Sequence, residues 1–88
     1  MPVYMVDRDL PGIKMEQLAE AQKAAIHLSE KMTAEGKRVR YIRSAFVPGD
    51  AHCMCFFEAA NADVVKELNE KAKIPFKRIV EAMDLTPK

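Results

Sequence analysis

The sequence predicts an α+β domain in which four antiparallel strands form a sheet and two helices cover one of its faces. Two observations lead to this fold class. The hydrophobic pattern changes between the short period of strands and the three-to-four-residue period of helices, and proline or glycine separates the segments. A chain of 88 residues, 49% hydrophobic and 31% charged, suits a single domain over residues 1–88.

The first half of the chain carries strand, helix and strand signals in turn. Val3–Arg8 is a short β-prone run, and the Pro-Gly pair that follows it breaks the strand. Met15–Glu35 repeats apolar residues every three or four positions, and Gly36 provides the usual helix stop. Arg38–Val47 is again rich in β-forming residues, so we expect the second strand there.

The second half begins with a hairpin and repeats the helix–strand order. Pro48-Gly49-Asp50 is a turn sequence, and Ala51–Glu58 reads as the third strand. Asn61 is a good N-cap for a second helix, which Pro75 must terminate. Arg78–Leu85 is the expected fourth strand. The resulting order, βαββαβ, is that of the ferredoxin-like fold, whose right-handed crossovers place both helices on the same face.

The other face of this sheet should not be bare. An antiparallel sheet with one wet face alternates apolar and polar residues, yet the third strand is apolar on both faces. Cys53, Cys55 and Phe57 lie on one face, and Met54 and Phe56 lie on the other. We therefore expect a homodimer that packs sheet on sheet, with a small-ligand cavity as the alternative reason for this pattern.

Composition argues against nucleic-acid and membrane partners. The formal net charge is +1, with no basic block. Arg38 and Arg40 should share one strand face while Arg43 points to the other, and the third strand lacks the glycine of an RNA-recognition motif. The longest stretch without a charged residue is Ala51–Phe57, too short to span a bilayer, and no apolar leader opens the chain. We expect a cytoplasmic protein.

The densest group of metal-ligand residues surrounds the start of the third strand. Asp50, His52, Cys53 and Cys55 offer carboxylate, imidazole and thiol groups, of which the softer ones suit nickel or zinc. Strand alternation places His52 opposite the two cysteines, so a closed site needs ligands from a second copy. Core packing is the alternative role of the cysteines, which we expect to be reduced and unlinked.

No catalytic motif stands out. The chain lacks the glycine-rich, nucleophile-elbow and zinc-protease patterns, and its two serines show no triad arrangement. His27 on the polar helix face reads as solvated, as do Asp7 and Arg8 at the end of the first strand. An enzyme of the dimeric α/β-barrel type, an oxygenase or isomerase, stays open only by analogy of fold.

Three segments carry a resemblance to a family. They are Met1-Pro2-x-Tyr4-x-Val6-Asp7-Arg8-x-Leu10-Pro11-Gly12, then Tyr41-Ile42-x-Ser44 followed by Cys53-x-x-Phe56, and Ile74-Pro75-x-x-x-Ile79-Val80-Glu81. Together they resemble a family of bacterial single-domain proteins of unknown function, some of which are described as nickel-binding and ferredoxin-like. The resemblance implies a ferredoxin-like fold, dimerisation through the sheet and a transition-metal role, with Cys53 matching by position. Leu68 stands where many relatives have histidine.

Overall fold

The computed structural model describes residues 1–85 and 87, so Thr86 and Lys88 of the expected domain lie outside the described residues. The elements follow the predicted order βαββαβ: β1 (Val3–Asp9), α1 (Met15–Ala34), β2 (Val39–Val47), β3 (His52–Ala59), α2 (Ala62–Ala72) and β4 (Arg78–Ala82). The strands form one antiparallel sheet in the order β2-β3-β1-β4. The ferredoxin-like fold class is confirmed.

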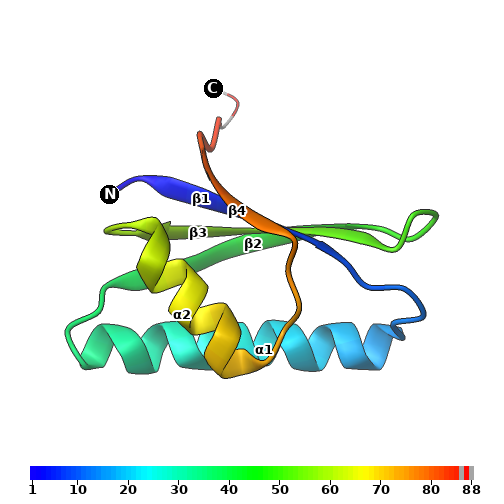
Figure 1. The fold of residues 1–88 in the computed structure, drawn as a ribbon, viewed down its shortest axis with the longest axis horizontal. Helices are drawn as coiled ribbons and strands as arrows, with labels where there is room; N and C mark the ends of the chain where they lie inside the picture. The colour runs from blue at the N-terminus through cyan, green and yellow to red at the C-terminus, as the bar shows by residue number, and fades with distance from the viewer. Residues whose placement is uncertain (86, 88) are drawn as a thin grey trace.

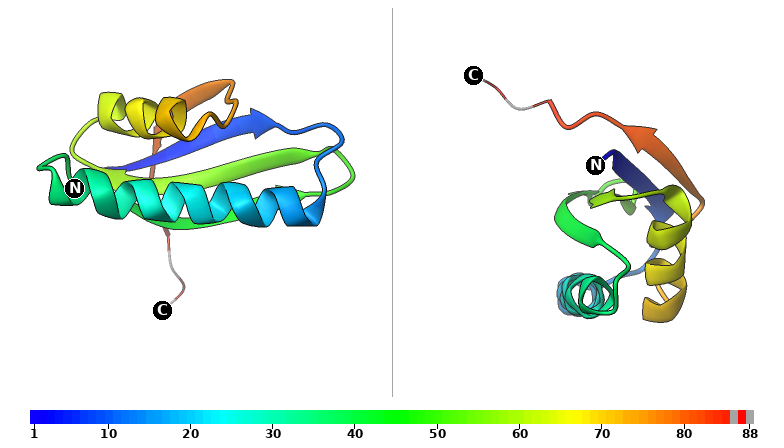
Figure 2. Two further views of the ribbon diagram at one scale, coloured as in Figure 1. Left: turned by 90° about the horizontal axis from the view of Figure 1, so that it is seen from below. Right: turned by 90° about the vertical axis from the view of Figure 1, so that its left-hand side faces the viewer.

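The two helices form one layer and the sheet forms the other (Figures 1 and 2). Both helices lie against the same side of the sheet, which we call the covered face. The opposite side, the open face, carries no helix or strand among residues 1–85. Neither helix is both long enough and apolar enough to cross a membrane, as judged over the residues that the structure describes.

Alternation along β3 defines the two faces. Cys53, Cys55, Phe57 and Ala59 are buried, whereas the residues between them are only half-buried. The cross-strand register extends this division to the neighbouring strands, because directly paired residues share a face. The open face accordingly carries the following residues: Val3, Met5, Asp7, Asp9, Arg40, Arg43, Ala45, Val47, His52, Met54, Phe56, Glu58, Arg78, Val80 and Ala82.

The ends of the elements follow local chemistry. The Asn61 side chain accepts a hydrogen bond from the Val64 backbone N–H at 3.1 Å, as predicted for an N-cap. Gly36 follows α1 with φ +94°, the left-handed conformation that glycine tolerates best. The fourth strand ends at Ala82 rather than Leu85, because its partner β1 starts at Val3, which pairs with Ala82.

A β-bulge in β2 corrects one sequence prediction. The register with β3 shifts between Tyr41 and Arg43, so the alternation of side chains slips by one residue there. Arg40 pairs with Glu58 and Arg43 pairs with Phe56, which places both arginines on the open face rather than on opposite faces. The same slip puts Tyr41 and Ser44 together on the covered face.

Candidate functional site

The structure separates the four residues predicted as metal ligands. His52 lies on the open face, whereas Cys53 and Cys55 are buried on the covered face. Asp50 is exposed in the turn before β3. Within residues 1–85 and 87, no group of three or more His, Cys, Asp or Glu side chains has the spacing of a metal site. The sequence therefore pointed to two places on β3 rather than one.

On the open face, His52 lies between two carboxylates of β1. Asp9 is its cross-strand partner, and Asp7 is two residues away on the same face of β1. The His52 Nδ1–H donates a hydrogen bond to Asp9 Oδ1 at 3.1 Å, since a carboxylate can only accept. The other ring nitrogen, Nε2, lies 2.6 Å from Asp7 Oδ1. We call Asp7, Asp9 and His52 the open-face cluster.

Two cations hold the outer oxygens of these carboxylates. Arg78 Nε donates to Asp7 Oδ2 at 3.1 Å, and Lys77 Nζ lies 3.2 Å from Asp9 Oδ2. The hydrogen bond from His52, followed by that from Lys77, lowers the pKa of Asp9 below its ordinary value. The other oxygen of each carboxylate, Oδ1, therefore faces the imidazole.

Asp7 is not the solvated residue that the sequence predicted. It is only 8% exposed, because it lies within the sheet between β3 and β4, where His52 and Arg78 approach it. Its Oδ1 is buried and lacks a hydrogen-bond partner within the described residues, since the close contact with Nε2 is not aligned as a hydrogen bond. An oriented carboxylate oxygen beside an imidazole nitrogen is a pair of donors for a cation.

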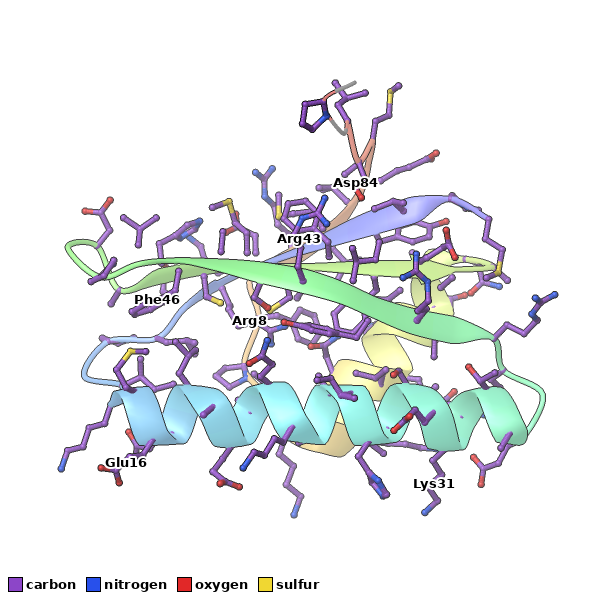
Figure 3. The ribbon with its side chains drawn as sticks, turned by 180° about the vertical axis from the view of Figure 1, so that it is seen from behind. Arg8, Glu16, Lys31, Arg43, Phe46 and Asp84 are labelled. Carbon is purple, nitrogen blue, oxygen red and sulfur yellow. The ribbon has the colours of Figure 1, made fainter. Side chains whose placement is uncertain are left out.

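On the covered face, Arg8 is the other correction. The sequence predicted a solvated arginine, but Arg8 is 1% exposed between the sheet and the helices (Figure 3). Its Nη2 donates to Asn69 Oδ1 at 2.8 Å and its Nη1 donates to the Pro75 carbonyl at 3.3 Å. Its Nε has no hydrogen-bond partner within the described residues. Both partners are neutral, which is unusual for a buried cation.

The two thiols lie beside this guanidinium. The Sγ atoms of Cys53 and Cys55 are 3.8 Å apart and are not joined in a disulfide. Ser44 Oγ donates a hydrogen bond to Cys55 Sγ at 3.0 Å. The hydrogen bond from Cys53, the Arg8 charge and the hydrogen bond from Ser44 lower the pKa of Cys55 to about 6 against the desolvation of the site. The same shared proton and burial raise the pKa of Cys53.

Sequence reasoning missed Asp9 as a partner of His52 and missed Ser44 as a partner of Cys55. The first had a signal, because Asp7 and Asp9 are two residues apart and must share a face of the strand. The second depends on the bulge in β2, for which the sequence shows no glycine or other mark.

Comparisons with known proteins agree with this fold. A family model described as "Nickel responsive protein SCO4226-like" matches residues 4–82. Among solved structures, the chain is similar to the crystal structure of SCO4226 from Streptomyces coelicolor A3(2), with a TM-score of 0.80 and 20% identity, over 96% of this chain and 99% of that chain. Similarity at this identity shows the fold. No curated protein matches the chain.

Proposed function

Since residues 4–82 match its model, this chain belongs to the family of nickel-responsive proteins similar to SCO4226, and we propose that it binds nickel on the open face of its sheet as a non-catalytic homodimer. His52 Nε2 and Asp7 Oδ1 would hold the ion. Imidazole and carboxylate are donors that Ni²⁺ accepts, so the open-face cluster fits this metal better than the buried thiols beside Arg8.

One observation carries the proposal. With Nδ1–H donated to Asp9, a neutral imidazole has its lone pair on Nε2, and this nitrogen lies 2.6 Å from Asp7 Oδ1, which has no hydrogen-bond partner among the described residues. Two lone pairs at this distance repel unless a positive species lies with them, either a proton on Nε2 or a metal ion. Asp9 then has the part that carboxylates often have in metal centres, since it fixes the tautomer and orientation of the imidazole.

A second copy would complete the ligand set. One protomer offers two donors at this position, fewer than the four or more that nickel and zinc sites use. The open face also bears the half-buried apolar residues Met5, Met54, Phe56 and Val80, which suit contact with another sheet. A two-fold axis through this face would bring two open-face clusters into one interface.

A nickel titration by calorimetry, on protein purified without a histidine tag, tests the metal site. We expect His52→Ala to weaken binding by about tenfold or more, because it removes a ligand and the group that orients Asp7. His27→Ala is the matched control, since His27 is exposed on α1 and should leave the affinity unchanged. Asp50→Ala tests the residue that the sequence suggested. Equal affinities of wild type and His52→Ala would contradict the proposal, as would a wild type that binds no nickel.

Proton competition gives the second test. Protons compete with a metal ion for an imidazole nitrogen, so nickel binding should weaken in acid and should release protons to the buffer. Sedimentation equilibrium at micromolar concentration tests the dimer, for which we expect twice the 9.9 kDa of one chain. A mass of one chain with and without nickel would contradict the homodimer.

The two free thiols suit a reducing compartment, and we therefore propose a cytoplasmic location.

A further inference from the structure

A cavity lies on the covered face, away from the open-face cluster. Its volume is about 150 Å³, and its walls come from α1, β1, β2, β3 and the segment after α2. Most of the lining is apolar: Leu10, Leu18, Ala21, Ala25, Phe46 and Ile74. A dry cavity of this size accommodates a molecule as large as benzene. The occupant that fits is therefore small and mostly hydrocarbon.

The charged residue in the wall is Arg8, which has no carboxylate partner among the residues that the structure describes. Arg8 lines the cavity, is 1% exposed, and donates hydrogen bonds to the neutral oxygens of Asn69 and Pro75. A buried cation is costly unless a negative charge lies near it. Cys55 lines the same cavity and can provide that charge as a thiolate, whereas none of the described salt bridges includes Arg8.

Hydrogen-bond donors converge on the Cys55 sulfur. Gln22 Nε2 donates to the Tyr41 hydroxyl at 3.0 Å, and this hydroxyl lies 2.5 Å from Ser44 Oγ. Ser44 Oγ donates in turn to Cys55 Sγ at 3.0 Å, so the Tyr41 O–H must donate to Ser44. The chain of donors therefore ends on the Cys55 sulfur. Cys53 Sγ lies 3.8 Å from it, and its S–H is a further donor when Cys55 is the thiolate.

We propose that Cys55 is a covalent capture site for small α,β-unsaturated carbonyl compounds that enter this cavity. The thiolate sulfur would add to the β carbon and form a C–S bond, while the C=C π electrons move toward the carbonyl oxygen to give an enolate. A proton from water at the α carbon then completes a thioether, so no oxidant or reductant is consumed. Arg8 provides the fixed positive charge for the enolate, and the apolar walls hold the hydrocarbon part.

The test compares two enones on wild-type protein. 2-Cyclohexen-1-one is close to benzene in size, and 4-phenyl-3-buten-2-one is larger than the cavity allows. After a timed reaction at neutral pH, acid quenching and peptide mapping by mass spectrometry locate the adducts. We expect native Cys55 to react with cyclohexenone at least about tenfold faster than Cys53, and this preference to be lost in urea. The larger enone should react slowly in the native protein and readily in urea.

Matched variants test the cavity itself. Ala21 lines it and Ala19 is exposed on the same helix, so Ala21→Phe should fill the space and slow capture by at least about tenfold, whereas Ala19→Phe should not. Cys55→Ala should abolish the native adduct, whereas Cys53→Ala should still form it at Cys55, more slowly because the hydrogen bond from Cys53 is lost. Similar native rates at both cysteines, or a native Cys55 no faster than unfolded Cys55, would overturn the proposal. Should Ala21→Phe fail to fold, the two enones on wild type still decide it.

Discussion

The two faces of this sheet use neighbouring residues for opposite chemistry. On β1, Asp7 points to the open face and the adjacent Arg8 to the covered face; on β3, the same holds for His52 and Cys53. The open face gathers two carboxylates and an imidazole, and two cations, Lys77 and Arg78, contact the carboxylates. The covered face gathers thiols and a guanidinium that line one cavity. One strand pair thus separates hard and soft ligands by the thickness of a sheet.

This difference explains why we expect metal binding on the open face and a reactive thiolate on the covered face. A site for a divalent cation needs donor atoms that are not already held by another group, and in the open-face cluster Arg78 holds Oδ2 of Asp7 and leaves Oδ1 for that purpose. A reactive thiolate instead needs positive charge and hydrogen-bond donors, which Arg8 and Ser44 supply on the covered face. Of the four residues predicted as one metal site, His52 lies on the open face, Cys53 and Cys55 lie on the covered face, and Asp50 lies in the turn before β3.

The largest difference between the two faces should appear in the free energy of unfolding when Phe56 and Phe57 are each replaced by alanine. Phe57 is fully buried on the covered face, where its ring meets Tyr41 edge-on at 5.5 Å, so Phe57→Ala should lower the free energy of unfolding by about 3–5 kcal/mol. Phe56 is half-buried on the open face, and Phe56→Ala should cost only about 1–1.5 kcal/mol in the monomer. Urea unfolding at low protein concentration measures both. Equal losses would remove the distinction between the faces.

The sequence was sufficient for the order of elements but only in part for the sites. Periodicity identified all six elements, because each long segment keeps a single period and ends at proline, glycine or a cap. Long-range register was not accessible: Asp9 and His52 meet across the β1–β3 pairing. Arg8 was assigned to solvent because charged residues seldom enter a core, and here Asn69 and a carbonyl provide the hydrogen bonds that permit it. The bulge that places Ser44 beside Cys55 has no recognisable pattern in the sequence.

The substitution Asp9→Asn tests whether the charge of Asp9 supports nickel binding on the open face. The amide keeps the size of the side chain and can still accept from His52 Nδ1–H, but it no longer bears the charge that strengthens the imidazole as a ligand. We expect nickel affinity to fall about 10–100-fold, a loss typical of such supporting carboxylates. Asp63→Asn, a change at an exposed carboxylate in the first turn of α2, is the control. An unchanged affinity would mean that Asp9 only neutralises Lys77.

The pH dependence of thiol alkylation tests which groups lower the pKa of Cys55 on the covered face. The rate of alkylation of Cys55 by iodoacetamide should rise with pH around the pKa of about 6, well below the ordinary thiol value of 9.0. Cys53→Ala removes the largest cause of this low pKa and should move the midpoint upward the most, followed by Ser44→Ala. Ser29→Ala is the matched control, since the buried Ser29 donates to the Ile26 carbonyl and not to a thiol. A midpoint near 9 in wild type would contradict the network.

The smallest effect should come from Lys77→Gln, which removes an exposed contact to Asp9 at 3.2 Å. The folded-state pKa of Asp9 is lowered by His52 first and by Lys77 second, so its ionised form stabilises the fold. A lowered carboxylate pKa contributes stability above the ordinary value of 3.8 and loses it as the pH falls through the lower folded-state value. Lys77→Gln should therefore be slightly less stable than wild type at neutral pH, and the difference should vanish in acid. Urea midpoints near neutral pH and in acid measure this, with Lys66→Gln, an exposed change on α2, as the control. A Lys77→Gln difference that grew as the pH fell would place its origin outside the open-face cluster.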